Sequence, residues 1–187
     1  MSNFNSIVDV IYKQNGGQPI VLNPTTVGHF QFSIGSAAAI ATVPNPASFS
    51  DDIGLFPNRA LNALPFVVRA AGLVQTGRGV PFQIDLNQST NPTPTIATTG
   101  PYTTPLGTGL FQDNFLLEAY CMWDPTSTNL RGIQYGWLGA NQISQTAILS
   151  GVQPASLAAL QFNVAVTVLS ANPGNQFTLT EFSIELI

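Results

Sequence analysis

The side chains of this sequence that could do chemistry are few and lie far apart. His29 is the single histidine and Cys121 the single cysteine, which excludes a disulfide within the chain and a zinc site made of cysteines alone. His29 belongs to a strand-like alternation with Phe30, Phe32 and Ile34, and no nucleophile-elbow pattern occurs, so an exposed strand residue is favoured over a catalytic base. Cys121 lies in an apolar run and is expected to be a buried thiol.

The acidic residues also fail to define a site. Asp51 and Asp52 could begin a calcium site, but the EF-hand spacing is absent, and Ser50 before them favours a helix N-cap. Glycoside hydrolysis needs two carboxylates about 5–10 Å apart. Nothing in the sequence selects a pair from Asp85, Asp113, Glu118, Asp124, Glu181 and Glu185. We therefore expect no catalytic, cofactor-binding or metal site, and a protein that is not an enzyme.

Two groups of residues suggest structure or recognition instead. Arg69 and Glu118 each interrupt an apolar strand, and an ion pair between them would offset the cost of burying either charge. Five aromatic residues could form a sugar-stacking platform like those of β-sandwich lectins: Tyr102, Tyr120, Trp123, Tyr135 and Trp137. Core or subunit-interface positions are the favoured interpretation, because Trp and Tyr on alternating strands commonly serve there.

The elements that carry these residues are strands, because apolar residues alternate with a period of two. Residues 115–123 and 130–138 form a hairpin around a turn at 124–129, which contains Asp and Pro. Further strands are expected at 65–74, 80–86, 95–98, 142–149, 162–168 and 176–187, with one helical turn within 152–160. The apolar pattern of the last strand changes phase, which indicates a bulge near Thr180 or burial on both faces. This spacing predicts an all-β fold, an antiparallel β-sandwich of jelly-roll type over residues 61–187.

Residues 1–60 differ from the rest and are expected to form an extended N-terminal arm or a small β subdomain. Strands are plausible at 7–12 and 29–34, whereas residues 35–58 are small, apolar and interrupted by proline. A structureless stretch of that length is uncommon inside a compact domain, so we expect it to lie against a neighbouring subunit. The interface residues expected in this segment are Phe4, Ile7, Tyr12, Phe30, Phe32, Phe49 and Phe56.

The amino-acid composition and charge argue against several classes of function. Only 7% of the 187 residues are charged, against about 25% in an ordinary soluble domain. The net charge is −4 and the five basic residues do not cluster, so nucleic-acid binding is not expected. The sequence has neither a signal-peptide start nor an apolar run of membrane-spanning length. We expect synthesis in a cytoplasm, no membrane partner, and a surface largely covered by other protein subunits.

Several segments resemble structural proteins of tailed-bacteriophage particles. These are Arg69-Ala70-Ala71-Gly72, Phe115-Leu116-Leu117-Glu118 leading to Trp123-Asp124, Gly132-Ile133-Gln134 leading to Gly136-Trp137, and Leu179-Thr180-Glu181-Phe182-Ser183-Ile184-Glu185. The sequence pattern of these segments is similar to that of small β-sandwich capsid decoration (cement) proteins. The resemblance covers about two-thirds of the chain. The resemblance implies a homotrimer on the outer capsid surface of the virion that binds the major capsid protein and needs no cofactor.

Three functions therefore follow from the sequence. The first is a structural virion protein that decorates and stabilises the assembled capsid. The second is a glycan- or receptor-binding module of a tail fibre or surface appendage, and the third is a jelly-roll major coat subunit. An aromatic platform beside polar side chains would favour the second.

Overall fold

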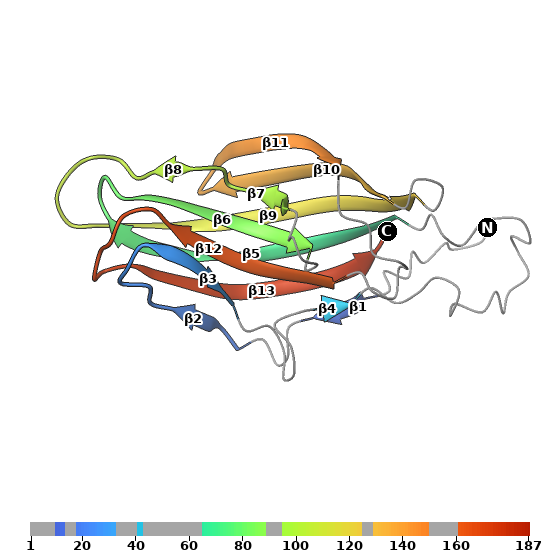
Figure 1. Ribbon diagram of the computed structural model, residues 1–187, viewed down its shortest axis with the longest axis horizontal. Coiled ribbons are helices and arrows are strands. Elements are labelled where there is room, and N and C mark those ends of the chain that lie inside the picture. Colours follow the sequence, from blue (N-terminus) through green and yellow to red (C-terminus); the bar gives the residue numbers. More distant parts are fainter. Residues whose placement is uncertain are drawn as a thin grey trace, which may run out of the picture.

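The structure is a computed structural model and describes residues 10–13, 18–32, 41–42, 65–88, 95–124, 129–149 and 161–187. Within these ranges all regular structure is β-strand, and every strand pairing is antiparallel. The strands form two sheets that face each other and run along the length of the molecule (Figure 1). The predicted all-β antiparallel sandwich is confirmed. None of the described residues forms a helix that could cross a membrane.

One sheet has seven strands among the described residues, in the order β1-β13-β5-β9-β10-β11, with β2 also paired to β13. Its strands are β1 (Val10–Lys13), β2 (Ile20–Leu22), β5 (Pro65–Gly77), β9 (Leu110–Asp124), β10 (Asn129–Leu138), β11 (Asn141–Leu149) and β13 (Gln176–Leu186). The long strands β5, β9 and β13 lie at its centre, so this sheet supplies the largest continuous surface of the fold.

The facing sheet has six described strands, in the order β3-β12-β6-β7, with β4 paired to β12 and β8 paired to β6. Its strands are β3 (Gly28–Gln31), β4 (Ala41–Thr42), β6 (Pro81–Gln88), β7 (Thr95–Thr98), β8 (Tyr102–Thr103) and β12 (Gln161–Val168). The chain crosses between the sheets at the β5–β6 and β12–β13 turns, so neighbouring segments of sequence contribute to opposite layers.

The core fills the space between the sheets with apolar side chains from the long strands of both layers. Phenylalanine dominates it, and two ring pairs bridge the layers. Phe66 on β5 meets Phe162 on β12 with centroids 6.0 Å apart, and Phe82 on β6 meets Phe177 on β13 at 5.5 Å, edge to face. All four rings are at most 1% exposed. Such tilted and edge-to-face contacts add to the stabilisation from apolar burial, so the two layers are held as one unit.

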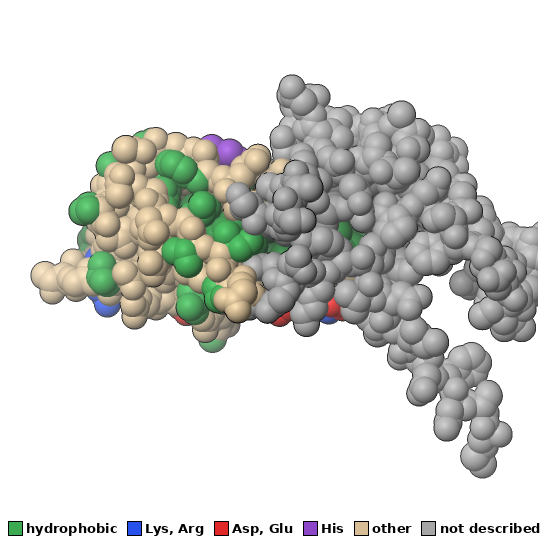
Figure 2. Space-filling view, turned by 90° about the horizontal axis from the view of Figure 1, so that it is seen from below, with side chains coloured by type: hydrophobic (Ala, Val, Ile, Leu, Met, Phe, Trp, Pro, Cys, Tyr) green, Lys and Arg blue, Asp and Glu red, His purple; other side chains and the backbone are tan. Residues whose placement is uncertain are grey.

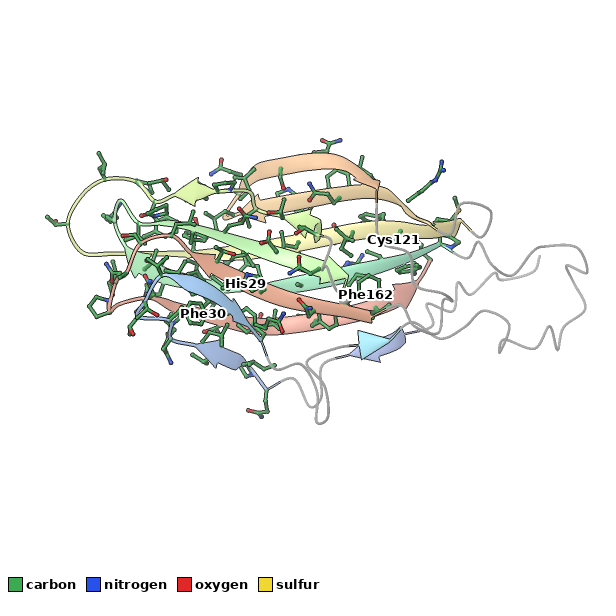
Figure 3. The ribbon with its side chains drawn as sticks, in the orientation of Figure 1. His29, Phe30, Cys121 and Phe162 are labelled. Carbon is green, nitrogen blue, oxygen red and sulfur yellow. The ribbon has the colours of Figure 1, made fainter. Side chains whose placement is uncertain are left out.

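The local predictions over residues 61–187 agree with the strands observed. The hairpin is β9 and β10, and its register runs unbroken from the turn to the pairing of Leu138 with Phe115. The expected bulge is present, because the pairing of β13 with β5 shifts between Leu179 and Glu181. Residues 141–149 form β11 as predicted. Cys121 is a buried thiol, as expected, and Figure 3 shows it and Phe162 on opposing sheets.

The N-terminal segment contributes strands to both sheets. β1 and β2 extend the seven-stranded sheet at β13, and β3 and β4 extend the six-stranded sheet at β12. These pieces of residues 1–60 are therefore integrated into the sandwich edges. The remainder of the expected arm lies outside the described residues, as do Asp51, Asp52 and the helical turn expected within 152–160.

The structure gives the expected interface residues different environments. Phe32 is 0% exposed and belongs to the core, which leaves it no surface for a neighbouring subunit, and Phe30 packs partly buried against the same core. Tyr12 lies on β1 and pairs with Ile184. Phe4, Ile7, Phe49 and Phe56 lie outside the described residues. A neighbour-facing role for the other six residues stays a prediction.

Candidate functional site

The outward face of the seven-stranded sheet collects the side chains with the most recognisable chemistry. β9 pairs with both β5 and β10 without a register shift. Because side chains alternate between the two faces of a strand, residues paired across these strands share a face. Glu118 on β9 has Tyr135 of β10 as its partner on one side and Arg69 of β5 on the other. An aromatic residue, an acid and a base thus stand in one row across three strands.

Three rings form an aromatic cluster on this face, which consists of Tyr120, Tyr135 and Trp137. Tyr135 and Trp137 stack with centroids 5.4 Å apart and an interplanar angle of 25°, and Tyr120 meets Tyr135 edge to face at 6.0 Å. All three are partly exposed. They line an open depression of about 530 Å³ together with Glu118 and Ile133.

The rings face outward because the inward side of β10 has no room for them. A side chain at Gly136 would collide with the Ser144 hydroxyl and with the Thr98 carbonyl of the facing sheet. Gln134, the next inward residue, is buried, and its Oε1 accepts a hydrogen bond from the Thr98 amide at 3.2 Å. The two sheets approach each other closely here, so the inward positions at Gly136 and Gln134 need a small residue or one that forms a hydrogen bond. The alternation of β10 then directs Tyr135 and Trp137 to the opposite face.

An ionic triad of Arg69, Glu118 and Glu185 borders the aromatic cluster. The Arg69 guanidinium donates to Glu118 Oε1 and to Glu185 Oε2, both at 2.8 Å, and the three side chains are 32%, 16% and 18% exposed. The hydrogen bond with Glu118 raises the pKa of Arg69, against the opposing effect of partial burial. Tyr120 donates its hydroxyl to Glu118 Oε2 at 3.3 Å, which links the triad to the cluster.

Glu118 keeps hydrogen-bonding capacity for a ligand. An ionised carboxylate has about four acceptor positions, and the contacts with Arg69 and Tyr120 use two of them. The triad as a whole carries one net negative charge. Both carboxylates are engaged by one guanidinium, which is typical of a structural ion pair and unlike a general acid kept neutral in an apolar pocket.

The sequence predicted part of this site. The Arg69–Glu118 pair is confirmed, and Glu185 is an addition. Of the five aromatic residues considered for a platform, three come together. Tyr102 lies elsewhere, on β8, with its ring 5.7 Å from Phe82 and 6.1 Å from Phe111, as expected for a core position. Trp123 lies on β9, but its side chain is outside what the structure describes.

The other groups with potential chemistry lie apart from this face. His29 is exposed on β3 of the facing sheet, as predicted, and its Nδ1 lies 3.1 Å from the Thr167 hydroxyl (Figure 3). Burial raises the pKa of the Cys121 thiol, so it remains protonated and unreactive. Among the described residues no group of three or more His, Cys, Asp or Glu side chains could hold a metal ion.

The surface otherwise carries little charge. On the face drawn in Figure 2 the few visible charged side chains lie near its lower edge, and most of the described surface is uncharged polar groups and backbone with apolar side chains between them. This agrees with the charged content of 7% in the whole sequence. The concentration of three ionised groups beside three aromatic rings is therefore unusual for this molecule.

Fold and site together define a β-sandwich with an aromatic, hydrogen-bonding surface on one sheet. No protein-family model matches the chain, and no curated protein matches it. Among solved structures it is similar to the CBM2 module of the evolved Dit of Lactobacillus casei BL23 phage J-1, with 10% identity, 95% of each chain covered and a TM-score of 0.41.

Two plant lectin structures show a similar level of likeness. Lectin UEA-II complexed with galactose is 8% identical over 96% of this chain and 98% of the lectin, with a TM-score of 0.39. Lectin I from Ulex europaeus, in complex with the methyl glycoside of α-L-fucose, is 8% identical over 94% and 96% of the two chains, with a TM-score of 0.37. Similarities this distant indicate nothing about the ligand of this chain.

Proposed function

We propose that this protein is a glycan-binding module whose binding surface is the aromatic cluster of Tyr120, Tyr135 and Trp137 with the adjoining Glu118. The observation that carries the proposal is the position of this cluster, partly exposed and directly beside a carboxylate. The module binds without transforming its ligand.

Sugar chemistry fits this arrangement. A pyranose ring has an apolar face of C–H groups and a rim of hydroxyls, so it needs an aromatic surface and hydrogen-bond acceptors close together. Tyr and Trp supply large apolar surfaces with a polar edge. Glu118 supplies acceptor positions for hydroxyl groups. A few polar groups set among apolar lining are the usual composition of a small-molecule site.

Charge further restricts the ligand class. The ionic triad has a net charge of −1 and its one cation is engaged on both sides by carboxylates. A sialylated or uronic-acid glycan would meet repulsion here without a free cation to offset it. Neutral glycans are therefore favoured.

Glycan-array binding followed by titration tests the proposal. Wild-type protein is expected to bind neutral glycans, and Trp137→Ala is expected to weaken binding by about 30-fold or more, as for an aromatic anchor at the centre of an interface. His29→Ala, on the facing sheet, serves as the control and should bind like the wild type. Binding that survives both Trp137→Ala and Tyr135→Ala would exclude this surface.

A second candidate function, decoration of a phage capsid as a homotrimer bound to the major capsid protein, has its own supporting observation. The loops that join β2 to β3, β8 to β9 and β12 to β13 gather at one end of the sandwich (Figure 1). These loops expose Val27 (61%), Leu106 (87%) and Leu169 (46%), and Leu110 at the start of β9 is 51% exposed. Apolar side chains grouped in this way are a feature of protein–protein contacts.

Measurement of the solution mass, alone and with empty phage capsids, tests this second candidate. A trimer that co-sediments with capsids would support the second candidate, provided that Leu106→Ser abolishes this co-sedimentation. A monomer that ignores capsids would exclude it, without bearing on glycan binding.

A further inference from the structure

The outward face of the seven-stranded sheet has a second depression, at the end of the sheet near the β5–β6 turn. Its volume is about 380 Å³, and four of its eight described lining residues carry uncharged amides, while Asp113 contributes the one charged side chain, a carboxylate. Gln112 Nε2 donates to Gln75 Oε1 at 2.5 Å, and Gln176 Nε2 donates to Asn23 Oδ1 at 3.1 Å. We call these four residues the amide belt. They stand in a row across β9, β5, β13 and the residue after β2.

The amide belt and the aromatic cluster face the same way. Gln112 and Glu118 are six residues apart on β9, which has no register shift against β5. An even separation places both side chains on one face, about 20 Å apart along the strand at about 3.3 Å per residue. Between them lie Leu116 and its partner Ala71, both partly buried and apolar, so no charged side chain of β9 or β5 interrupts the path.

A third depression continues the path at the other end. Its volume is about 190 Å³ and its surface is mostly apolar, with Pro65 and Met122 in its lining, although Arg131 lines it as well. Tyr120 lines both this depression and that of the aromatic cluster, so the two lie next to each other. From Gln112 to Met122 the surface follows ten residues of β9, or about 33 Å.

The amide and apolar side chains along this path suit a ligand that is an uncharged, hydroxylated polymer. Each primary amide offers donors and an acceptor without formal charge, which suits hydroxyl groups that both donate and accept. Leu73 is 49% exposed within the amide-lined depression and offers an apolar surface beside the amides. Neither Lys nor Arg lines that depression among the described residues.

We infer that the ligand of the proposed site is an extended, neutral oligosaccharide chain that runs along β9, with one part on the aromatic cluster and another on the amide belt. This inference rests on the proposed function and adds to it that the site has several subsites and prefers a polymer. A monosaccharide would cover only the aromatic part of a surface about 33 Å long.

The test is isothermal titration of neutral oligosaccharides of one to six units from the cello-, malto- and chito-series. In the series that binds, affinity is expected to rise with chain length beyond two units. Gln112→Ala removes one exposed amide and is expected to weaken binding of the six-unit chain by about three- to tenfold, as for one or two hydrogen bonds. It should leave binding of the shortest binding member unchanged.

Gln31→Ala is the matched control, because Gln31 is an exposed amide on β3 of the facing sheet. It should leave binding of all chain lengths unchanged. The inference would be overturned if affinity reached its maximum at one or two units, or if Gln112→Ala lowered affinity equally for all lengths. The proposed function would still stand in either case if binding depended on Trp137. Absence of binding to any member would overturn both.

Discussion

The two outward faces of this sandwich have contrasting chemistry although they cover one shared core. On the seven-stranded sheet an aromatic cluster, an ionic triad and an amide belt lie partly exposed in one line. On the six-stranded sheet the outward residues of β6 and β12 are mostly polar, and several of them form hydrogen bonds with one another. Gln83 donates to Asp85 at 2.8 Å and Asn87 donates to Asn163 at 3.4 Å, and no Phe, Tyr or Trp is found among that sheet's described outward residues.

The contrast shows which polar groups remain free to bind a ligand. Asp85, Asn87 and Asn163 are at most 5% exposed, so their hydrogen bonds serve the fold. Glu118 and Gln112 instead combine exposure with acceptor positions that internal contacts leave open. The proposed recognition role is therefore assigned to the seven-stranded sheet, and the other face provides matched control positions for mutagenesis.

The largest expected effect comes from the core that both faces share. Phe177→Ala removes a fully buried ring that meets Phe82 of the facing sheet, and should lower the free energy of unfolding by about 3–5 kcal/mol. Guanidinium unfolding followed by tryptophan fluorescence and by circular dichroism should give one coincident transition. The exposed Leu73→Ala should change stability by less than about 0.5 kcal/mol. Separate transitions would mean that the two faces are independently stable.

Removal of the cation from the ionic triad is expected to have the next largest effect. Arg69→Met leaves Glu118 and Glu185 without their shared partner. Because the three side chains are only partly buried, the expected loss is about 1–2 kcal/mol, between the values for exposed and fully buried pairs. The exposed Arg78→Met is the control and should lie within about 0.5 kcal/mol of the wild type. Equal effects of the two variants in denaturant unfolding would show that the triad contributes no stability.

The contrast between the faces could be predicted from the sequence only in part. Isolated charges in apolar strands predicted the Arg69–Glu118 pair, and the change of phase after Leu179 predicted the bulge. Glu185 was missed, because its proximity to Arg69 depends on the register that the bulge imposes between β13 and β5. The outward direction of Tyr135 and Trp137 was also undetermined. It follows from the close approach of Thr98 and Ser144 to Gly136, a tertiary contact with no local signal.

A comparison of the two sides of β9 gives an effect that is small near neutral pH and grows in alkaline solution. Burial raises the pKa of Cys121 in the folded protein, whereas the unfolded thiol ionises near pH 8.5. Above that pH the unfolded state binds fewer protons, so stability should fall by up to about 1.4 kcal/mol per pH unit. Wild type and Cys121→Ala should therefore differ in the slope of unfolding free energy against pH between about 8.5 and 10.

Thiol labelling directly checks the difference in exposure between the inward and outward sides of β9. Native wild-type protein should react with an aromatic disulfide reagent only as it unfolds, since Cys121 is 2% exposed. Met122 is 43% exposed on the outward side, so Met122→Cys in the Cys121→Ala background should react at once. Rapid labelling of the native wild type would contradict the assignment of Cys121 to the core.

The smallest expected effect is that of His29→Ala. His29 is exposed on the six-stranded sheet and its one described contact, with Thr167, is also exposed, so stability should change by no more than about 0.5 kcal/mol. If recognition belongs to the other face, titration with a bound neutral glycan should give the wild-type affinity, in contrast to Trp137→Ala. A loss of affinity in His29→Ala with unchanged stability would place part of the ligand on the six-stranded sheet. The difference in chemistry between the faces would then no longer indicate where the ligand binds.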